Sequence, residues 1–195
     1  PLTSGEVRLK GENITGLAPF QINRRGLSRS FQVTNIFPRL SVFENIRCGV
    51  LWALGYRYSF WQMVEKARDA RERTEAILEQ INLSARRDVP AGVLSYAEQR
   101  ALEIGVTIAG GADVIMLDEP TAGMSVDEVP VILDLIRELK SRKDKLILLV
   151  EHKMDVVSEL AVRHELAVVE HDDAVGQFAD HVHLVFHQQD QLVLA

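Results

Sequence analysis

The sequence predicts an α/β protein with a parallel sheet, chiefly because of three segments in its second half. Residues 114–117 (Val-Ile-Met-Leu) and 146–150 (Leu-Ile-Leu-Leu-Val) are short, wholly apolar runs, as expected of strands buried on both faces of a parallel sheet. Residues 125–142 between them have the apolar periodicity of a helix. The predicted core face of that helix consists of Val131, Ile132, Leu135, Ile136 and Leu139. A strand, a helix and a strand in this order predict a βαβ unit.

The composition of the chain narrows the classes of protein to which it can belong. It has 195 residues, of which 47% are hydrophobic, as is typical of one globular domain with a sizeable core. Cys48 is the single cysteine, so no internal disulfide can form, and a reducing compartment is expected. The formal net charge of −6 argues against a protein that holds nucleic acid through its overall field. No uncharged stretch is long enough for a membrane span.

The first half of the chain predicts a short β region followed by a helical unit. The predicted elements are an edge strand at 5–10, a helix at 18–25, a strand at 27–32, and helices at 41–54 and 61–81. Ser41, with Glu44 three residues later, is the expected cap of the first long helix. The charges along the second are expected to form a solvated face with i,i+4 pairs. Residues 41–83 therefore look like a separate, mainly helical insert.

Two adjacent carboxylates form the sharpest chemical signal. Asp118 and Glu119 directly follow the apolar run at 114–117, and ligands in open α/β sheets bind at the carboxyl ends of strands. An aspartate there can hold Mg²⁺ directly or through water, because that ion prefers oxygen ligands and keeps several waters. The glutamate points elsewhere and can polarise an attacking water. The plainer interpretation is a helix cap or a turn begun with Pro120.

The second signal is the segment 94–100 (Leu-Ser-Tyr-Ala-Glu-Gln-Arg), just ahead of the acidic strand. Ser95 and Glu98 have the spacing of a capping box, which explains both residues as structure. That interpretation leaves Gln99 and Arg100 unexplained. A helix N-terminus that carries a serine hydroxyl is also an anion site.

Two further residues are weak signals by themselves. His152 follows the second apolar run, beside the strand that ends in carboxylates, where it can contact a γ-phosphate or the attacking water. A surface histidine is the usual interpretation of such a position. Gln32 ends a predicted strand, and a loop glutamine is the default interpretation there.

Taken together and in this order, these elements resemble those of an ABC-type ATPase subunit. Gln32 is similar to the glutamine-loop residue, residues 94–99 to the signature segment, and residues 114–119 to Walker B followed by the catalytic glutamate. Residues 121–125 resemble the D-loop, and His152 resembles the switch histidine. The resemblance covers about residues 5–160. Residues 29–38 and 117–124 look most like the branched-chain amino-acid importers, with related urea or amide importers as alternatives.

The resemblance implies an α/β, P-loop NTPase-like ABC ATPase domain that acts as an ATP-driven motor with ATP and Mg²⁺. Asp118 would bind Mg²⁺, and Gln32 would sense the ion and relay its presence to a membrane subunit. Glu119 would orient or deprotonate water, and His152 would contact the γ-phosphate. Metal and positioned donors would stabilise charge on the transferring phosphoryl group.

The resemblance also implies partners. A second ATP-binding subunit would complete two nucleotide sites, and Ser95, Ala97 and Gln99 of the signature segment would lie at the nucleotide of that partner. Integral membrane permease subunits would dock on the helical insert, which places the chain peripherally at the cytoplasmic face of the inner or plasma membrane. No nucleic-acid partner is expected. The insert has an aromatic stretch that is a candidate contact surface, with packing inside the insert as the equal alternative: Trp52, Tyr56, Tyr58, Phe60 and Trp61.

The sequence departs from the family pattern at the phosphate-binding loop. A Walker A motif reads G-x-x-x-x-G-K-[ST], and none of the 12 glycines is followed by lysine. In the family this loop lies upstream of the predicted strand at 5–10, so we expect the domain to be N-terminally incomplete and ATP binding by the chain alone to be weak. Tyr96-Ala97 also replaces the commonest Gly-Gly of the signature, and Ala97 lacks the bare backbone that approaches phosphate closely.

A second departure lies near the C-terminus. Val150-Glu-His152 recurs as Val169-Glu-His171, which suggests a local duplication, with His171 as the fallback switch residue. Residues 181–186 and 191–194 resemble the terminal hairpin of the family. All six histidines lie in this last stretch, but their spacing matches no standard zinc site.

These observations predict three parts: residues 1–36 with the glutamine loop, a helical subdomain at 37–93, and an α/β core at 94–195. The expected function is that of the ATP-hydrolysing subunit of an importer, with a non-hydrolysing regulatory or binding module as the alternative. An ABC-type ATPase of chromosome maintenance is disfavoured, because Gln32 and Ser95 are too close for a long coiled coil between them.

Overall fold

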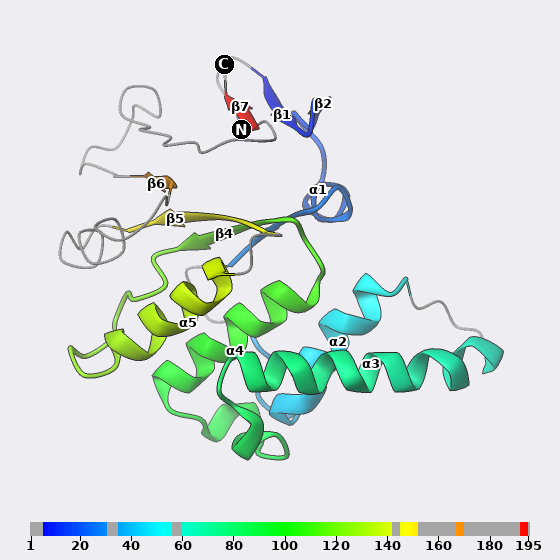
Figure 1. The fold of residues 1–195 in the computed structure, drawn as a ribbon, viewed down its shortest axis with the longest axis vertical. Coiled ribbons are helices and arrows are strands. Elements are labelled where there is room, and N and C mark those ends of the chain that lie inside the picture. The colour runs from blue at the N-terminus through cyan, green and yellow to red at the C-terminus, as the bar shows by residue number, and fades with distance from the viewer. Residues whose placement is uncertain are drawn as a thin grey trace.

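A computed structural model places the elements of the chain in space (Figure 1). It describes residues 6–30, 35–55, 60–141, 145–151, 167–169 and 192–194. For residues 60–67 and for the last two segments, it describes the backbone and not the side chains. The strands are β1 Val7–Leu9, β2 Glu12–Asn13, β3 Leu27–Arg29, β4 Val114–Asp118, β5 Leu146–Val150, β6 Ala167–Val169 and β7 Leu192–Leu194. The α-helices are α1 Pro19–Arg24, α2 Val42–Ala53, α3 Phe60–Gln80, α4 Tyr96–Ala109 and α5 Val129–Ser141, and short 3₁₀ turns cover η1 Ser84–Arg86 and η2 Ala91–Val93.

The predicted parallel sheet is confirmed. Its four strands follow the order β3-β4-β5-β6, and each neighbouring pair is parallel. Helix α5 connects β4 to β5, which completes the expected βαβ unit. The helix begins at Val129, four residues later than predicted. Residues 126–128 form a turn instead, in which the Glu128 carboxylate accepts hydrogen bonds from the backbone N–H and the hydroxyl of Ser125. Val131 was wrongly assigned to the core face, since it is 52% exposed.

Both faces of the two central strands are buried, as their apolar sequences predicted. Ile115, Leu117, Ile147 and Leu149 belong to the large core shared with the helices. The alternating residues of β4 and β5 contact a smaller cluster on the other face, formed with Leu9 and Ile14. In Figure 1, α4 and α5 accordingly lie on one side of the sheet, with α1 and β1 on the other.

Strand β1 is not an edge strand, which corrects the prediction for residues 5–10. It lies between β2 and β7 in a three-stranded antiparallel sheet. A contact with a segment more than 180 positions away cannot be inferred from alternation of side chains, which is the same for edge and central strands (the register pairs Val7 with Leu194). Lys10, at the turn before β2, forms an ion pair with Asp113 ahead of β4.

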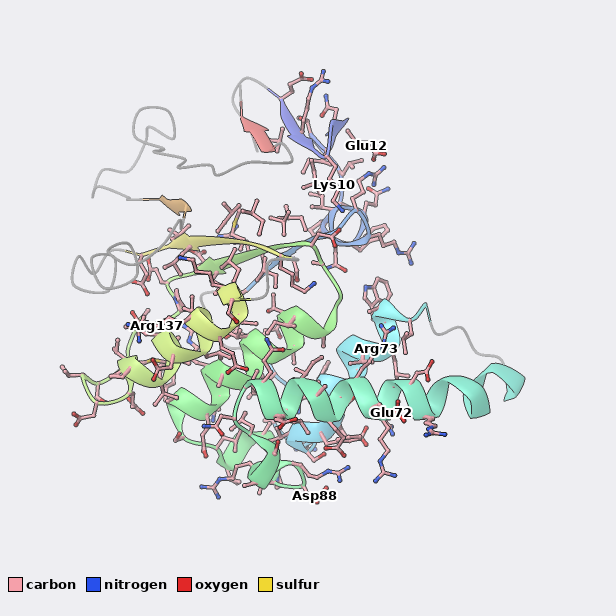
Figure 2. The ribbon with its side chains drawn as sticks, in the orientation of Figure 1. Lys10, Glu12, Glu72, Arg73, Asp88 and Arg137 are labelled. Carbon is pink, nitrogen blue, oxygen red and sulfur yellow. The ribbon has the colours of Figure 1, made fainter. Side chains whose placement is uncertain are left out.

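Helices α2, α3 and α4 pack against one another and share the large core. Ser41 caps α2 as predicted, by accepting a hydrogen bond from the N–H of Glu44 at 3.1 Å. Gly105 permits the close approach in this layer, because an added Cβ would lie 2.7 Å from methyl groups of both Ile46 and Ile81. The outer face of α3 is charged and solvated, with Glu72 and Arg73 pointing away from the helix (Figure 2).

The repeated Val-Glu-His segments begin on neighbouring strands. Strand β6 pairs with β5, and Val169 lies opposite Val150. These two valines are the first residues of the two copies. The histidines of both copies, and the other four, fall outside the described residues, so the prediction of a switch histidine at His152, with His171 as the fallback, is not tested. The division at residues 36 and 93 also stays a prediction. Among the described helices, none combines the length and apolar composition that a membrane span requires.

Candidate functional site

The end of β4 makes a sharp turn immediately after its last residue. Asp118 ends the strand, and Glu119 adopts a φ of 45°, in the left-handed region that residues other than glycine rarely occupy. The N–H of Glu119 donates to the carbonyl of Val150 at 2.8 Å, so the backbone remains attached to β5 as it turns. The N–H of Ala122 then donates to the carbonyl of Glu119 at 3.0 Å. The two carboxylates therefore occupy a strained, fixed turn at the carboxyl end of the sheet.

Asp118 is held by residues at the end of β3. The carboxylate lies 2.5 Å from the guanidinium of Arg29, and its side chain is 19% exposed. The N–H of Asp118 donates to the hydroxyl of Ser30 at 3.1 Å, and the N–H of Ser30 donates to the carbonyl of Met116 at 2.8 Å. No role for Arg29 was predicted from the sequence. The available signal was its position at the end of a strand, since the ends of parallel strands meet at one edge of a sheet.

A buried glutamate fixes the loop that follows Glu119. Glu151 is the first residue after β5, and it is 2% exposed. Its carboxylate accepts hydrogen bonds from the N–H of Thr121 at 3.0 Å and from the Thr121 hydroxyl at 2.7 Å. The ends of β4 and β5 are therefore joined through side chains as well as through the sheet. Glu151 was also missed by sequence reasoning, although its place beside His152 at a strand end was a signal.

The first turn of α4 is organised by a capping box, as predicted. The N–H of Glu98 donates to the Ser95 hydroxyl at 3.2 Å, and the N–H of Ser95 donates to the Glu98 carboxylate at 2.8 Å. The hydrogen bond from the Ser95 N–H holds the pKa of Glu98 below its ordinary value, although partial burial acts to raise the pKa. The guanidinium of Arg86, 3.0 Å from the carboxylate, lowers the pKa further. Of the other predicted signature residues, Gln99 donates its side-chain N–H to the Leu94 carbonyl at 3.0 Å, and Ala97 is buried in the large core.

Tyr96 connects this helix turn to the loop after Glu119. Its hydroxyl donates to the carbonyl of Ala122 at 3.0 Å. Gly123, which has a φ of 75°, lies under the ring, and an added Cβ there would be 3.2 Å from the Tyr96 oxygen. The guanidinium of Arg100 lies 5.6 Å from the ring centroid and is itself paired with Glu103 at 2.9 Å. The capping box leaves Arg100 unexplained. The structure shows that this buried arginine packs on the ring of Tyr96.

Glu128 closes the part of the loop that leads into α5. Hydrogen bonds from the backbone N–H and the hydroxyl of Ser125 hold the pKa of Glu128 below its ordinary value. The loop that begins at Glu119 thus contacts the first turn of α4 through the Tyr96 hydroxyl. The carboxylates at the end of β4 and the predicted signature segment are parts of one assembly.

The residues at Asp118 fit a cation, although they do not form a complete metal cage. The shielded carboxylate already binds a positive group, the guanidinium of Arg29. In the described part of the chain, no three acidic, histidine or cysteine side chains gather as a metal-binding cluster. A single carboxylate with water suits Mg²⁺, which is usually held by one or two carboxylates and substrate phosphates. Gln32 and His152, the other predicted residues at this site, lie outside the described residues.

Comparison with known proteins agrees with this architecture. The chain is 33% identical over 164 residues to the high-affinity branched-chain amino acid transport ATP-binding protein BraF of Pseudomonas aeruginosa, covering 82% of this chain and 64% of BraF. It is 32% identical over 169 residues to LivG of Escherichia coli, a protein of the same description, covering 83% of this chain and 65% of LivG. The chain therefore spans slightly less than two-thirds of the length of these relatives.

Solved structures share the fold. The ADP conformation of MJ1267, an ATP-binding cassette of an ABC transporter, superposes with a TM-score of 0.64 at 29% identity, over 85% of this chain and 65% of that one. The dimeric, post-hydrolysis cassette MJ0796 bound to ADP and Pi has a TM-score of 0.66 at 21% identity, over 86% of this chain and 70% of that one. The family model for ABC transporter matches residues 1–122, more than half of the sequence, so the chain belongs to the ABC transporter family.

Proposed function

We propose that this chain is the ATP-binding and ATP-hydrolysing subunit of an ABC importer for branched-chain amino acids, and that it couples hydrolysis to uptake. The observation that carries the proposal is the turn at the end of β4, where Asp118 and Glu119 are held by contacts from β3 and β5. The names of BraF and LivG support the choice of solute.

The roles of the residues follow from their chemistry and from the family resemblance. Asp118 binds Mg²⁺ directly or through water, and Gln32 is a further contact of the ion. When bound, the metal neutralises charge on the phosphates. Glu119 orients the attacking water and accepts its proton, because a carboxylate on a fixed turn can be held within reach of that proton. His152 donates to the γ-phosphate.

The first turn of α4 faces the nucleotide of a second ATP-binding subunit. The Ser95 hydroxyl accepts the hydrogen bond of the capping box and still has its own proton to donate. The amides of the first helical turn, including that of Ala97, favour an anion. Gln99 donates a hydrogen bond to the Leu94 carbonyl and so fixes the backbone just ahead of the capping residue Ser95. Integral membrane permease subunits at the cytoplasmic face of the membrane are the other partners.

Binding of Mg-ATP tests this function. The 195 residues contain no G-x-x-x-x-G-K-[ST] motif, so this chain should bind Mg-ATP weakly. A version preceded by a phosphate-loop segment should bind Mg-ATP with a Kd of about micromolar. Asp118→Asn in that version should remove the dependence of binding on Mg²⁺, and Asp134→Asn on the exposed face of α5 is the control. Tight binding by the chain alone would contradict the role of the missing loop. If neither version binds, the non-hydrolysing module is the better description.

A further inference from the structure

Arg29 and Asp118 form an ion pair between two neighbouring strand ends. Arg29 is the last residue of β3, and Asp118 is the last residue of β4. A guanidinium nitrogen lies 2.5 Å from one carboxylate oxygen of Asp118. The two side chains differ in exposure, at 61% for Arg29 and 19% for Asp118. The carboxylate is therefore largely shielded, while the cation that satisfies it reaches in from solvent.

The backbone around this pair is fixed, so the side chain of Arg29 is the part that can move. Ser30 is 4% exposed and forms hydrogen bonds with Asp118 and Met116 of β4. Strand register places Arg29 opposite Met116. A change at the site can therefore release the guanidinium without separating β3 from β4.

A divalent cation and the guanidinium would compete for the same carboxylate. Both carry positive charge, and like charges a few ångströms apart repel even where solvent screens them. Mg²⁺ also requires near-ideal octahedral geometry and keeps several waters, which need the space around the carboxylate oxygen. The Arg29 side chain is 61% exposed, so water can solvate the guanidinium when it leaves, while the cation takes over the charge of the shielded carboxylate.

We propose that Arg29 occupies the Asp118 carboxylate when no metal is bound and is displaced when a divalent cation binds there. Arg29 thus holds the carboxylate in position and lowers its affinity for the metal. The proposal rests on the proposed function, because it takes Asp118 as the metal ligand. It assigns to Arg29 the role of a positioning residue at the end of β3.

Mn²⁺ titration of the purified 195-residue chain without nucleotide tests the competition. Paramagnetic broadening of the backbone N–H signals of Ser30 and Met116 reports the ion at Asp118. Arg29→Gln should lower the apparent Kd for Mn²⁺ by up to about fivefold, the equivalent of about 1 kcal/mol. The matched control is Arg137→Gln, which removes another arginine–aspartate pair, at 2.6 Å on α5, and should leave the Kd unchanged.

The wild-type chain provides a readout that does not depend on folding of a variant. Titration with Mg²⁺ should shift the side-chain N–H signal of Arg29 toward that of a free arginine as the guanidinium leaves the carboxylate. An unchanged Arg29 signal at saturating Mg²⁺ would overturn the displacement. An unchanged or higher Kd in Arg29→Gln would overturn the competition.

Asp118→Asn separates failure of this inference from failure of the proposed function. If Asp118→Asn abolishes the broadening but Arg29→Gln has no effect on the Kd, only the competition is wrong. If Asp118→Asn leaves the broadening intact, Asp118 is not the metal ligand, and both the metal role and the inference that depends on it fail.

Discussion

The first turn of α4 and the end of β4 are held in different ways. Ser95 and Glu98, in the helix turn, are three residues apart in sequence. At the strand end, Asp118 pairs with Arg29 across 89 positions, and Thr121 binds Glu151 across 30. The helix turn is therefore organised by its own sequence, whereas the strand end depends on the assembled sheet. Loss of a contact at the strand end should disturb the site more than loss of one at the helix turn.

The largest effect is expected at Glu151. Glu151→Ala leaves the N–H and hydroxyl of buried Thr121 without their acceptor, which should lower the free energy of unfolding by about 1–3 kcal/mol. Glu151→Gln keeps an acceptor oxygen and should cost less than half as much. Urea denaturation measures both variants, and equal losses would show that the acceptor oxygen is not what the loop requires.

At the helix turn, Ser95→Ala removes the cap and should cost about 1 kcal/mol. The reason is that the N–H of Glu98 loses a hydrogen-bond acceptor that water replaces only in part. The loss should be confined to α4, and hydrogen exchange of the Ala122 and Gly123 amides should not change. Ser84→Ala, at a 3₁₀ turn without a side-chain cap, is the control. Faster exchange at Ala122 would show that loss of the cap also loosens the contact between Tyr96 and the loop.

Tyr96→Phe tests the link between the two regions. The variant removes the hydrogen bond to the Ala122 carbonyl, and it should cost about 0.5–1 kcal/mol because the tyrosine is partly exposed. Amide exchange should accelerate in the loop after Glu119 and stay unchanged along α4. No change in the loop would mean that the Tyr96 hydrogen bond does not hold it in place.

The smallest effect is a pH dependence that arises from Glu98. Because its folded-state pKa lies below the ordinary value, the ionised form favours folding. This stabilisation, less than about 1 kcal/mol for a partly exposed group, is present at neutral pH. It is lost as the pH falls below the ordinary value near 4.5 and through the lower folded-state pKa. Unfolding curves of Glu98→Gln, measured from neutral to acid pH, should show a weaker dependence than those of the wild type.

The same contrast explains what the sequence could predict. The capping box of α4 and the bounds of β5 were predicted correctly, because a serine–glutamate spacing and a wholly apolar run are local patterns. The central position of β1 and the pairing of Arg29 with Asp118 were not predicted, because both depend on which strands become neighbours. The bond from Tyr96 to Ala122 depends on the path of the loop, which the left-handed turn at Glu119 sets.

ATP hydrolysis by a Glu119→Gln variant tests the central claim most directly, in a version of the chain that is preceded by a phosphate-loop segment. Glutamine keeps the size of the side chain but cannot accept a proton from water, so hydrolysis should fall about 100-fold or more. Binding of Mg-ATP should be retained, and Glu138→Gln on α5 should hydrolyse ATP at the wild-type rate. Unchanged hydrolysis in Glu119→Gln would contradict the assignment of the end of β4 as the catalytic centre.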